Sequence, residues 1–155
     1  MTVKAVPAGY HTVTPYLIVD GAAAALEFYK KAFGAEEVMR MPMPTDNGDK
    51  IAHAELQFGD SRVMLADEFP AMGAKGPKAI GGTPVGLCLY VSDVDALFAR
   101  ATGAGCTVER PLTNQFYGDR SATLIDPYGH KWTIATHIED VSPEEMGRRM
   151  AAMGS

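Results

Sequence analysis

The same order of secondary-structure signals occurs twice in this chain, and this repeat constrains the fold more than any other feature. Shifting the sequence by about 72 residues places Thr14 on Gly86 and Val19 on Val91. Both halves then predict strand, helix, strand, strand, strand, although few side chains are identical. An internal duplication implies that each half is one structural unit. We therefore expect an α+β fold of two tandem βαβββ modules, whose sheets curl into a cup around a pocket.

The first module is expected at about residues 12–68. Asp20 is the predicted N-cap of a helix that ends near Phe33. In the last hairpin of the module, a two-residue turn at Asp60-Ser61 would place Gln57 opposite Met64. The strands of this module are predicted at Thr12–Val19, Glu37–Met41, Ile51–Phe58 and Arg62–Asp67, with a turn at 46–49.

The second module is expected at about residues 85–138, with Ser92 or Asp93 as the N-cap of its helix. Residues 69–84 are rich in Gly and Pro and lack periodicity, so they predict a linker. Within it, residues 73–82 either act as a lid or serve only as a connector. Ser142 begins a capping box, which predicts a final helix at about 142–153 that packs on its own domain or on a partner subunit. The strands are predicted at Val85–Val91, Thr107–Arg110, Ser121–Ile125 and Lys131–Thr136.

Composition narrows the class of protein. The net charge is −5 and the Lys and Arg residues are scattered, which argues against nucleic acid as a partner. No apolar stretch is long enough to cross a bilayer, and the N-terminal residues lack the apolar centre of a signal peptide. Cys88 and Cys106 have no CxxC spacing, so neither a disulfide framework nor a zinc cluster is expected. We expect a cytoplasmic protein.

Four segments carry a resemblance to a known family. They are VTPYLIVDGAAAALEFYKKAFG, HAELQFGDSRVMLADE, LCLYVSDVDALFARATGAG and FYGDRSATLIDPYGHKW. Together they resemble the vicinal oxygen chelate superfamily, which includes glyoxalase I, extradiol dioxygenases, fosfomycin-resistance enzymes and bleomycin-binding proteins, and within it the PhnB-like subgroup. The resemblance covers residues 12 to about 146. It implies the glyoxalase/bleomycin-resistance fold, in which paired βαβββ modules form an incomplete barrel around a small-molecule pocket, and it implies a homodimer.

The resemblance also locates the places where metal-dependent members hold their ion. Alignment with the family motifs assigns these places to Thr14, Met64, Gly86 and Thr133. A divalent cation prefers imidazole or carboxylate donors, whereas these residues offer hydroxyls, a thioether and no side chain at all. We therefore expect no metal and no cofactor at the family's positions.

Two polar residues are candidates for catalysis. His53 and Glu55 are two residues apart on a predicted strand, so both face the concave side of the sheet, roughly 6–7 Å apart. Such a pair could act as a base and its orienting partner, or the two side chains could simply satisfy each other. His137 has the side-chain parity of Thr133, so it could join them in a relocated metal site.

The candidate ligand-binding residues combine aromatic walls with few polar groups, as small-molecule pockets do. Arg120 could clamp a carboxylate or phosphate, or pair with an acidic neighbour such as Asp119 and fix its loop. The full set is Tyr16, Gln57, Met64, Tyr90, Phe116, Tyr117 and Arg120.

Three functions follow from these residues. The first is metal-independent binding of a small, partly aromatic or apolar molecule. The second is a metal-free isomerase or lyase that uses His53 as the base and Glu55 as its orienting partner. The third is a metal enzyme with a relocated site at His53, Glu55 and His137.

Overall fold

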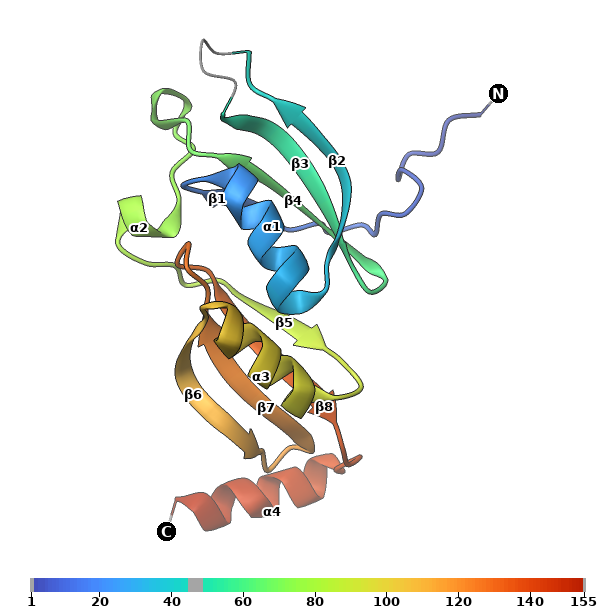
Figure 1. Ribbon diagram of the computed structural model, residues 1–155. Coiled ribbons are helices and arrows are strands. Elements are labelled where there is room, and N and C mark those ends of the chain that lie inside the picture. The colour runs from blue at the N-terminus through green and yellow to red at the C-terminus, as the bar shows by residue number, and fades with distance from the viewer. Residues whose placement is uncertain (1, 45–48, 155) are drawn as a thin grey trace. The chain divides into compact units, whose positions relative to one another are not determined.

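The computed structural model describes residues 2–44 and 49–154, and the predicted turn at 46–49 lies mostly outside them. The chain divides into two compact units, Met1–Thr83 and Pro84–Ser155. Each unit contains a four-stranded mixed sheet with a helix packed on one face (Figure 1). The predicted α+β class and the two βαβββ modules are confirmed.

The first sheet has the strand order β1-β4-β3-β2, and β1 runs parallel to β4. Helix α1 buries its apolar side against the sheet through Leu26 and Tyr29, which are completely buried together with Leu56 and Leu65 of the strands. Gly34 ends the helix as predicted, with a positive φ of 71° that favours glycine. The elements are β1 (Tyr16–Val19), α1 (Ala22–Phe33), β2 (Glu36–Pro42), β3 (Ile51–Phe58) and β4 (Ser61–Asp67).

The predicted cap of α1 is wrong. Gly21 occupies the N-cap position, and no side chain of that position caps the helix. The buried carboxylate of Asp67, at the end of β4, instead accepts hydrogen bonds from the backbone N–H groups of Gly21 and Ala22, both at 2.9 Å. Its second oxygen accepts from the N–H of Ile51 at 2.8 Å. Asp67 therefore satisfies the start of α1 and the start of β3 at once.

The predicted hairpin register is also wrong, although the two faces are right. Phe58 pairs with Ser61, so the turn is Gly59-Asp60, and Glu55 lies opposite Met64. The actual register differs from the predicted one by two residues. Because strand side chains alternate with a period of two, the same residues still face the helix.

The second sheet repeats this arrangement in the order β5-β8-β7-β6. Asp93 caps α3 by accepting a hydrogen bond from the N–H of Ala96 at 3.0 Å. In the turn before β8, the buried Asp126 accepts from the Trp132 indole N–H at 2.9 Å, which fixes this ring in the core. The elements are β5 (Gly86–Tyr90), α3 (Val94–Ala104), β6 (Thr107–Asn114), β7 (Asp119–Ile125), β8 (Lys131–His137) and α4 (Pro143–Met153).

Two segments contain more regular structure than the sequence predicted. The edge strand β6 continues to Asn114 instead of ending at Arg110, with register shifts on both sides of Arg110. An edge strand tolerates Pro111, because one side of it needs no ladder hydrogen bonds. The segment between the modules contains a 3-10 turn at Pro70–Met72 and the short helix α2 at Pro77–Ile80.

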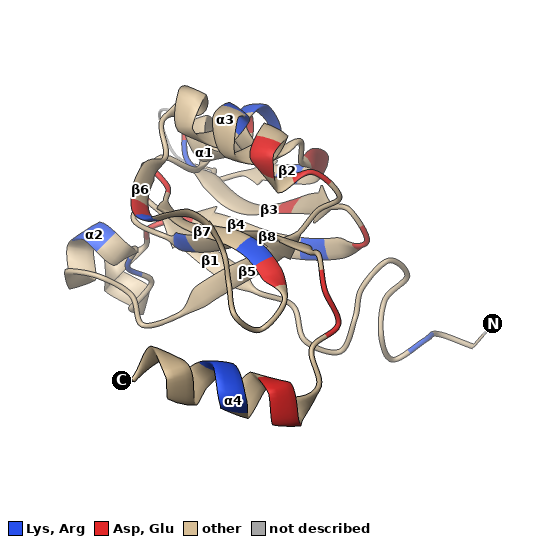
Figure 2. Cartoon of the chain, turned by 90° about the horizontal axis from the view of Figure 1, so that it is seen from below, with Lys and Arg blue, Asp and Glu red and all other residues tan. Residues whose placement is uncertain are grey.

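Helix α4 is capped as predicted, since the Ser142 hydroxyl accepts from the N–H of Glu145 at 3.2 Å. Figure 2 shows acidic residues in its first turn and basic residues after them. Arg149 pairs with Glu139 at 2.7 Å and donates to the carbonyl oxygen of Phe116 at 3.0 Å. These contacts tie α4 to its own module. Within the described residues, no helix has the length and apolar character needed to cross a membrane.

Candidate functional site

The concave face of each sheet, opposite its helix, carries a row of side chains at the same place in the repeat. In the first sheet the strand register aligns Tyr16, Met64, Glu55 and Met39. The corresponding row of the second sheet is Cys88, Thr133, Thr123 and Arg110. Met64 and Thr133, two of the positions assigned by resemblance to the metal, are thus structurally equivalent.

The row in the first sheet belongs to a hydrogen-bonded network. The His53 ring lies between the Tyr16 hydroxyl, 2.8 Å from Nδ1, and the Glu55 carboxylate, 3.1 Å from Nε2. An ionised carboxylate only accepts, so Nε2 donates, and in the neutral ring Nδ1 then accepts the Tyr16 hydroxyl proton. The Tyr10 hydroxyl, followed by His53 and Arg62, lowers the pKa of Glu55. The predicted pair therefore exists, and both ring nitrogens are engaged.

The same face is closed by residues near the N-terminus. The Arg62 guanidinium lies 5.0 Å from the centre of the Tyr10 ring, and its Nε donates to Gln57. A Cβ atom on Gly9 would come within 2.6 Å of Arg62, so the chain passes close above it. The Tyr10 hydroxyl is buried and close enough to Glu55 to lower its pKa, but it has no hydrogen-bond partner among the residues that the structure describes. Most polar groups on this face satisfy one another.

A second polar cluster surrounds Asp119, the first residue of β7. Its buried carboxylate accepts from the Tyr90 hydroxyl at 2.7 Å and lies 2.7 Å from Nδ1 of His137. Nε2 of His137 lies 2.7 Å from Asp140. Asp119, followed by Asp140, raises the pKa of His137, and the hydrogen bond to Asp119 raises the pKa of Tyr90 to about 12. Tyr90, predicted as an aromatic wall, has its hydroxyl held by this cluster.

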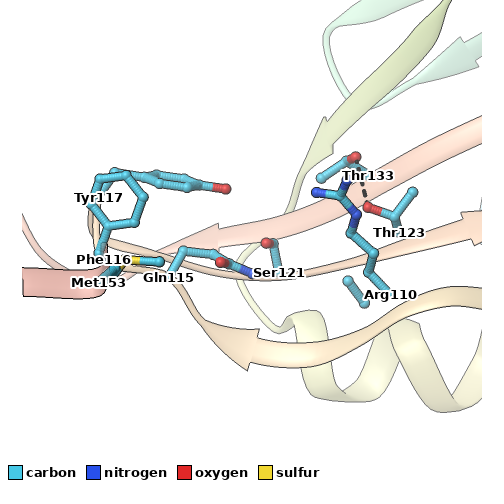
Figure 3. Close-up of a pocket in the computed structure, with 9 residues that line it drawn as sticks. Arg110, Gln115, Phe116, Tyr117, Ser121, Thr123, Thr133 and Met153 are labelled. Carbon is cyan, nitrogen blue, oxygen red and sulfur yellow. Dashed lines mark hydrogen bonds between the residues drawn. The ribbon is translucent and has the colours of Figure 1, made fainter. Parts of the chain in front are cut away.

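Beside this cluster, a pocket of about 330 Å³ opens on the second module. Figure 3 shows aromatic and thioether side chains at one end and the Arg110 guanidinium beside two threonines at the other. The lining residues come from β6, β7, β8, the 115–117 turn and the end of α4. They are Arg110, Gln115, Phe116, Tyr117, Ser121, Ala122, Thr123, Thr133 and Met153.

Gly118 holds the aromatic end of this pocket in place. Its φ is 103°, and a Cβ atom there would clash with the carbonyl oxygen of Glu139. The Gly118 carbonyl accepts from the N–H groups of Ile138 and Glu139 at 2.9 and 3.0 Å. The turn before it presents Phe116 and Tyr117, whose rings meet edge to face at 5.3 Å.

The structure brings together only part of the predicted ligand set. Phe116 and Tyr117 line the pocket, and Tyr90 and Arg120 belong to the same module without lining it. The remaining predicted residues, Tyr16, Gln57 and Met64, lie in the first module.

Two arginines have surroundings that differ from those expected of a ligand-binding residue in the sequence analysis. Arg120 forms a two-point contact with Asp95 at 2.9 and 3.0 Å and donates to Asn114 at 3.0 Å. These contacts match the structural alternative, in which an ion pair holds Arg120, although its partner is Asp95 and not Asp119. Arg110 lines the pocket and was missed. Simple alternation along the edge strand does not indicate it, because the register shifts on both sides of Arg110.

Comparison with known proteins identifies the family to which this architecture belongs. Residues 10–134 match the family model of the Glyoxalase/Bleomycin resistance protein/Dioxygenase superfamily. The chain belongs to this superfamily. An uncharacterised protein of Mycobacterium bovis is 43% identical over 145 residues, which cover 92% of this chain and 93% of that protein.

Solved structures of the superfamily fold agree with this assignment. TioX from Micromonospora sp. ML1 is 28% identical with a TM-score of 0.65, covering 83% of this chain and 99% of that one. A PhnB protein from Bacillus cereus, titled a putative 3-demethylubiquinone-9 3-methyltransferase, shares the fold at 18% identity and a TM-score of 0.62, covering 81% and 99%.

The four residues that the resemblance assigns to the metal positions lack the imidazole and carboxylate donors that a divalent cation prefers. Met64 and Thr133 occupy the centres of their rows, Thr14 precedes β1, and Gly86 begins β5. The Thr133 hydroxyl is already in contact with that of Thr123 at 3.3 Å. Across residues 2–44 and 49–154, no group of three or more His, Cys, Asp or Glu side chains is arranged to hold a metal. The donors of the relocated site are divided between the modules, with His137 in the second.

Proposed function

We propose that this member of the superfamily is a metal-independent binding protein that takes a small, partly aromatic or apolar molecule into the pocket of its second module. The observation that carries the proposal is the lining of this pocket. Two aromatic rings and a thioether surround one end, and a few polar groups stand at the other. Its volume of about 330 Å³ suits a small ligand, because pockets for such molecules begin at roughly 300 Å³.

The chemistry of the metal positions supports the same function. Relatives that hold a divalent ion need imidazole or carboxylate donors, and the equivalent Met64 and Thr133 supply neither. The pocket of the second module can still bind an organic molecule through its lining side chains. Binding therefore requires fewer assumptions than turnover.

The test is a ligand screen by thermal shift, followed by calorimetry on each hit with and without EDTA. Tyr117→Ala removes one wall of the pocket, and Phe69→Ala in the first module is the matched control, since the two side chains are 37% and 39% exposed. We expect Tyr117→Ala to weaken binding about tenfold, the loss of one aromatic contact of about 1.4 kcal/mol. Phe69→Ala should leave the affinity unchanged.

Three results would contradict the proposal. Equal affinity in wild type and Tyr117→Ala would place the ligand elsewhere. Loss of binding in EDTA, restored by a stoichiometric divalent cation, would refute metal independence. Conversion of the ligand during incubation would show an enzyme.

One observation favours a second candidate, a metal-free isomerase or lyase in the first module. Tyr16, His53 and Glu55 form a continuous hydrogen-bonded chain, as a base with an orienting partner requires. Because both ring nitrogens are occupied, a substrate proton would reach His53 through the Tyr16 hydroxyl. Loss of turnover in both His53→Ala and Tyr16→Phe, with ligand binding retained, would support this mechanism. Unchanged turnover in either variant would exclude it.

A further inference from the structure

We propose that the ligand of the second-module pocket carries a carboxylate, which Arg110 holds through two parallel hydrogen bonds. The inference rests on the proposed function and specifies its ligand class. It starts from the arginine that the sequence did not single out. Arg110 lies on β6 opposite Thr123, and Figure 3 shows its guanidinium reaching toward the Thr123–Thr133 pair.

Arg110 differs from the other arginines in having no partner. Within the described residues it makes no hydrogen bond and no ion pair, whereas most other arginines are held by acceptors. Acceptors lie within hydrogen-bonding distance of, among others, Arg40, Arg62, Arg120, Arg148 and Arg149. A guanidinium has five donors in a planar fork that matches the two oxygens of a carboxylate. The pocket thus contains an unused donor set of that shape.

The two threonines add a further donor. Thr123 and Thr133 share one hydrogen bond at 3.3 Å, in which either hydroxyl is the donor. One hydroxyl proton is used by that bond, and the other is free to point into the pocket. A carboxylate has about four acceptor sites, so it can take this proton in addition to the fork of Arg110.

The charges around the pocket favour an anion. None of the lining residues is Asp or Glu, so no side-chain carboxylate in the lining neutralises Arg110. The nearby Asp119 is already held by Tyr90 and His137.

The opposite end selects the rest of the ligand. Phe116, Tyr117 and Met153 form an apolar wall there. A molecule that satisfies both ends has an aromatic or branched apolar body with a single carboxylate at one side. An aryl carboxylic acid is a simple compound with this pattern.

The test uses three probes with one ring system and different head groups: 2-naphthoate, 2-naphthamide and 2-naphthyl phosphate. Binding is followed at neutral pH by NMR of a protein labelled with ¹³C in the methionine methyl groups. The Met153 methyl reports on the pocket, and the Met72 methyl, 81% exposed in the first module, is the internal reference. Arg110→Gln removes the fork, and Arg148→Gln on α4 is the charge-matched control.

We expect 2-naphthoate to shift the Met153 signal and to bind about 10- to 100-fold more tightly than the amide, the usual range for a charge-assisted hydrogen bond. In Arg110→Gln the naphthoate should lose this advantage and bind like the amide. Arg148→Gln should behave like wild type.

The test distinguishes failure of the carboxylate inference from failure of the proposed binding function. Equal binding of acid and amide in wild type, with Met153 shifted by both, would overturn the carboxylate inference and leave the pocket's function standing. A tenfold preference for the phosphate would replace the carboxylate by a phosphate monoester. No Met153 shift with any probe would refute both the inference and the aromatic pocket on which it rests.

Discussion

Replacing Asp67 by alanine should destabilise the first module far more than replacing Asp20, although the sequence alone favours Asp20 as the helix cap. The Asp67 carboxylate is 6% exposed and accepts from three backbone N–H groups at 2.8–2.9 Å. Hydrogen bonds to a charged group contribute roughly 1.5–3 kcal/mol each, and unpaired buried donors cost about 1–3 kcal/mol. Because water replaces part of the loss, we expect Asp67→Ala to lower the free energy of unfolding by about 3–5 kcal/mol.

The control and the assay follow from the same contacts. Asp20 is exposed and caps nothing, so Asp20→Ala should change stability by about 0.5 kcal/mol at most. Urea unfolding followed by far-ultraviolet circular dichroism measures both variants. Native-state hydrogen exchange locates the effect, because the amides of Ala22 and Ile51 should lose protection only in Asp67→Ala. A loss for Asp20→Ala that equals or exceeds the loss for Asp67→Ala would refute the reasoning.

Two further predictions concern the second module. Trp132→Phe removes the buried 2.9 Å hydrogen bond to Asp126 and should lower the free energy of unfolding by about 1–3 kcal/mol. Because the chain has a single Trp, the unfolding of this variant is measured by circular dichroism and not by tryptophan fluorescence. The pKa of His137 should be above its ordinary value of about 6.5 in an NMR titration and should fall in Asp140→Asn. Because folding raises the pKa of His137, its contacts with Asp119 and Asp140 stabilise the fold fully at pH values below the unfolded pKa. This stabilisation is lost as the pH rises through the folded pKa. An unshifted His137 would contradict the contact with Asp119.

Local and periodic features of the fold were predictable from the sequence. The repeat gave both βαβββ modules, and Gly34, Asp93 and Ser142 end or begin helices where expected, because the preferences of caps depend on neighbouring residues. The capping of α1 was not predictable in this way. Asp67 is 46 residues from Gly21, and only the parallel pairing of β1 with β4 brings it to the start of the helix.

The residues of the candidate site also divide into those that local sequence features indicate and those that they do not. Phe116 and Tyr117 could be identified because an aromatic pair before a glycine marks a loop that presents side chains. Arg110 could not, because Pro111 follows it and the strand has register shifts on both sides of it. Arg120 was expected at the ligand, but its guanidinium is held by Asp95 and Asn114, and it does not line the pocket.

The equivalence of the two rows shows why the proposed carboxylate site suits the second module better than the first. Met39 occupies in the first sheet the place that Arg110 has in the second, and Glu55 occupies the place of Thr123. An arginine at position 39 would lie opposite the Glu55 carboxylate and be neutralised by it, as Arg40 is by Glu37. In the second module the same place faces a hydroxyl, which leaves the guanidinium free to bind an external anion. One topology, duplicated, therefore carries a self-satisfied polar network in one copy and an open cationic pocket in the other.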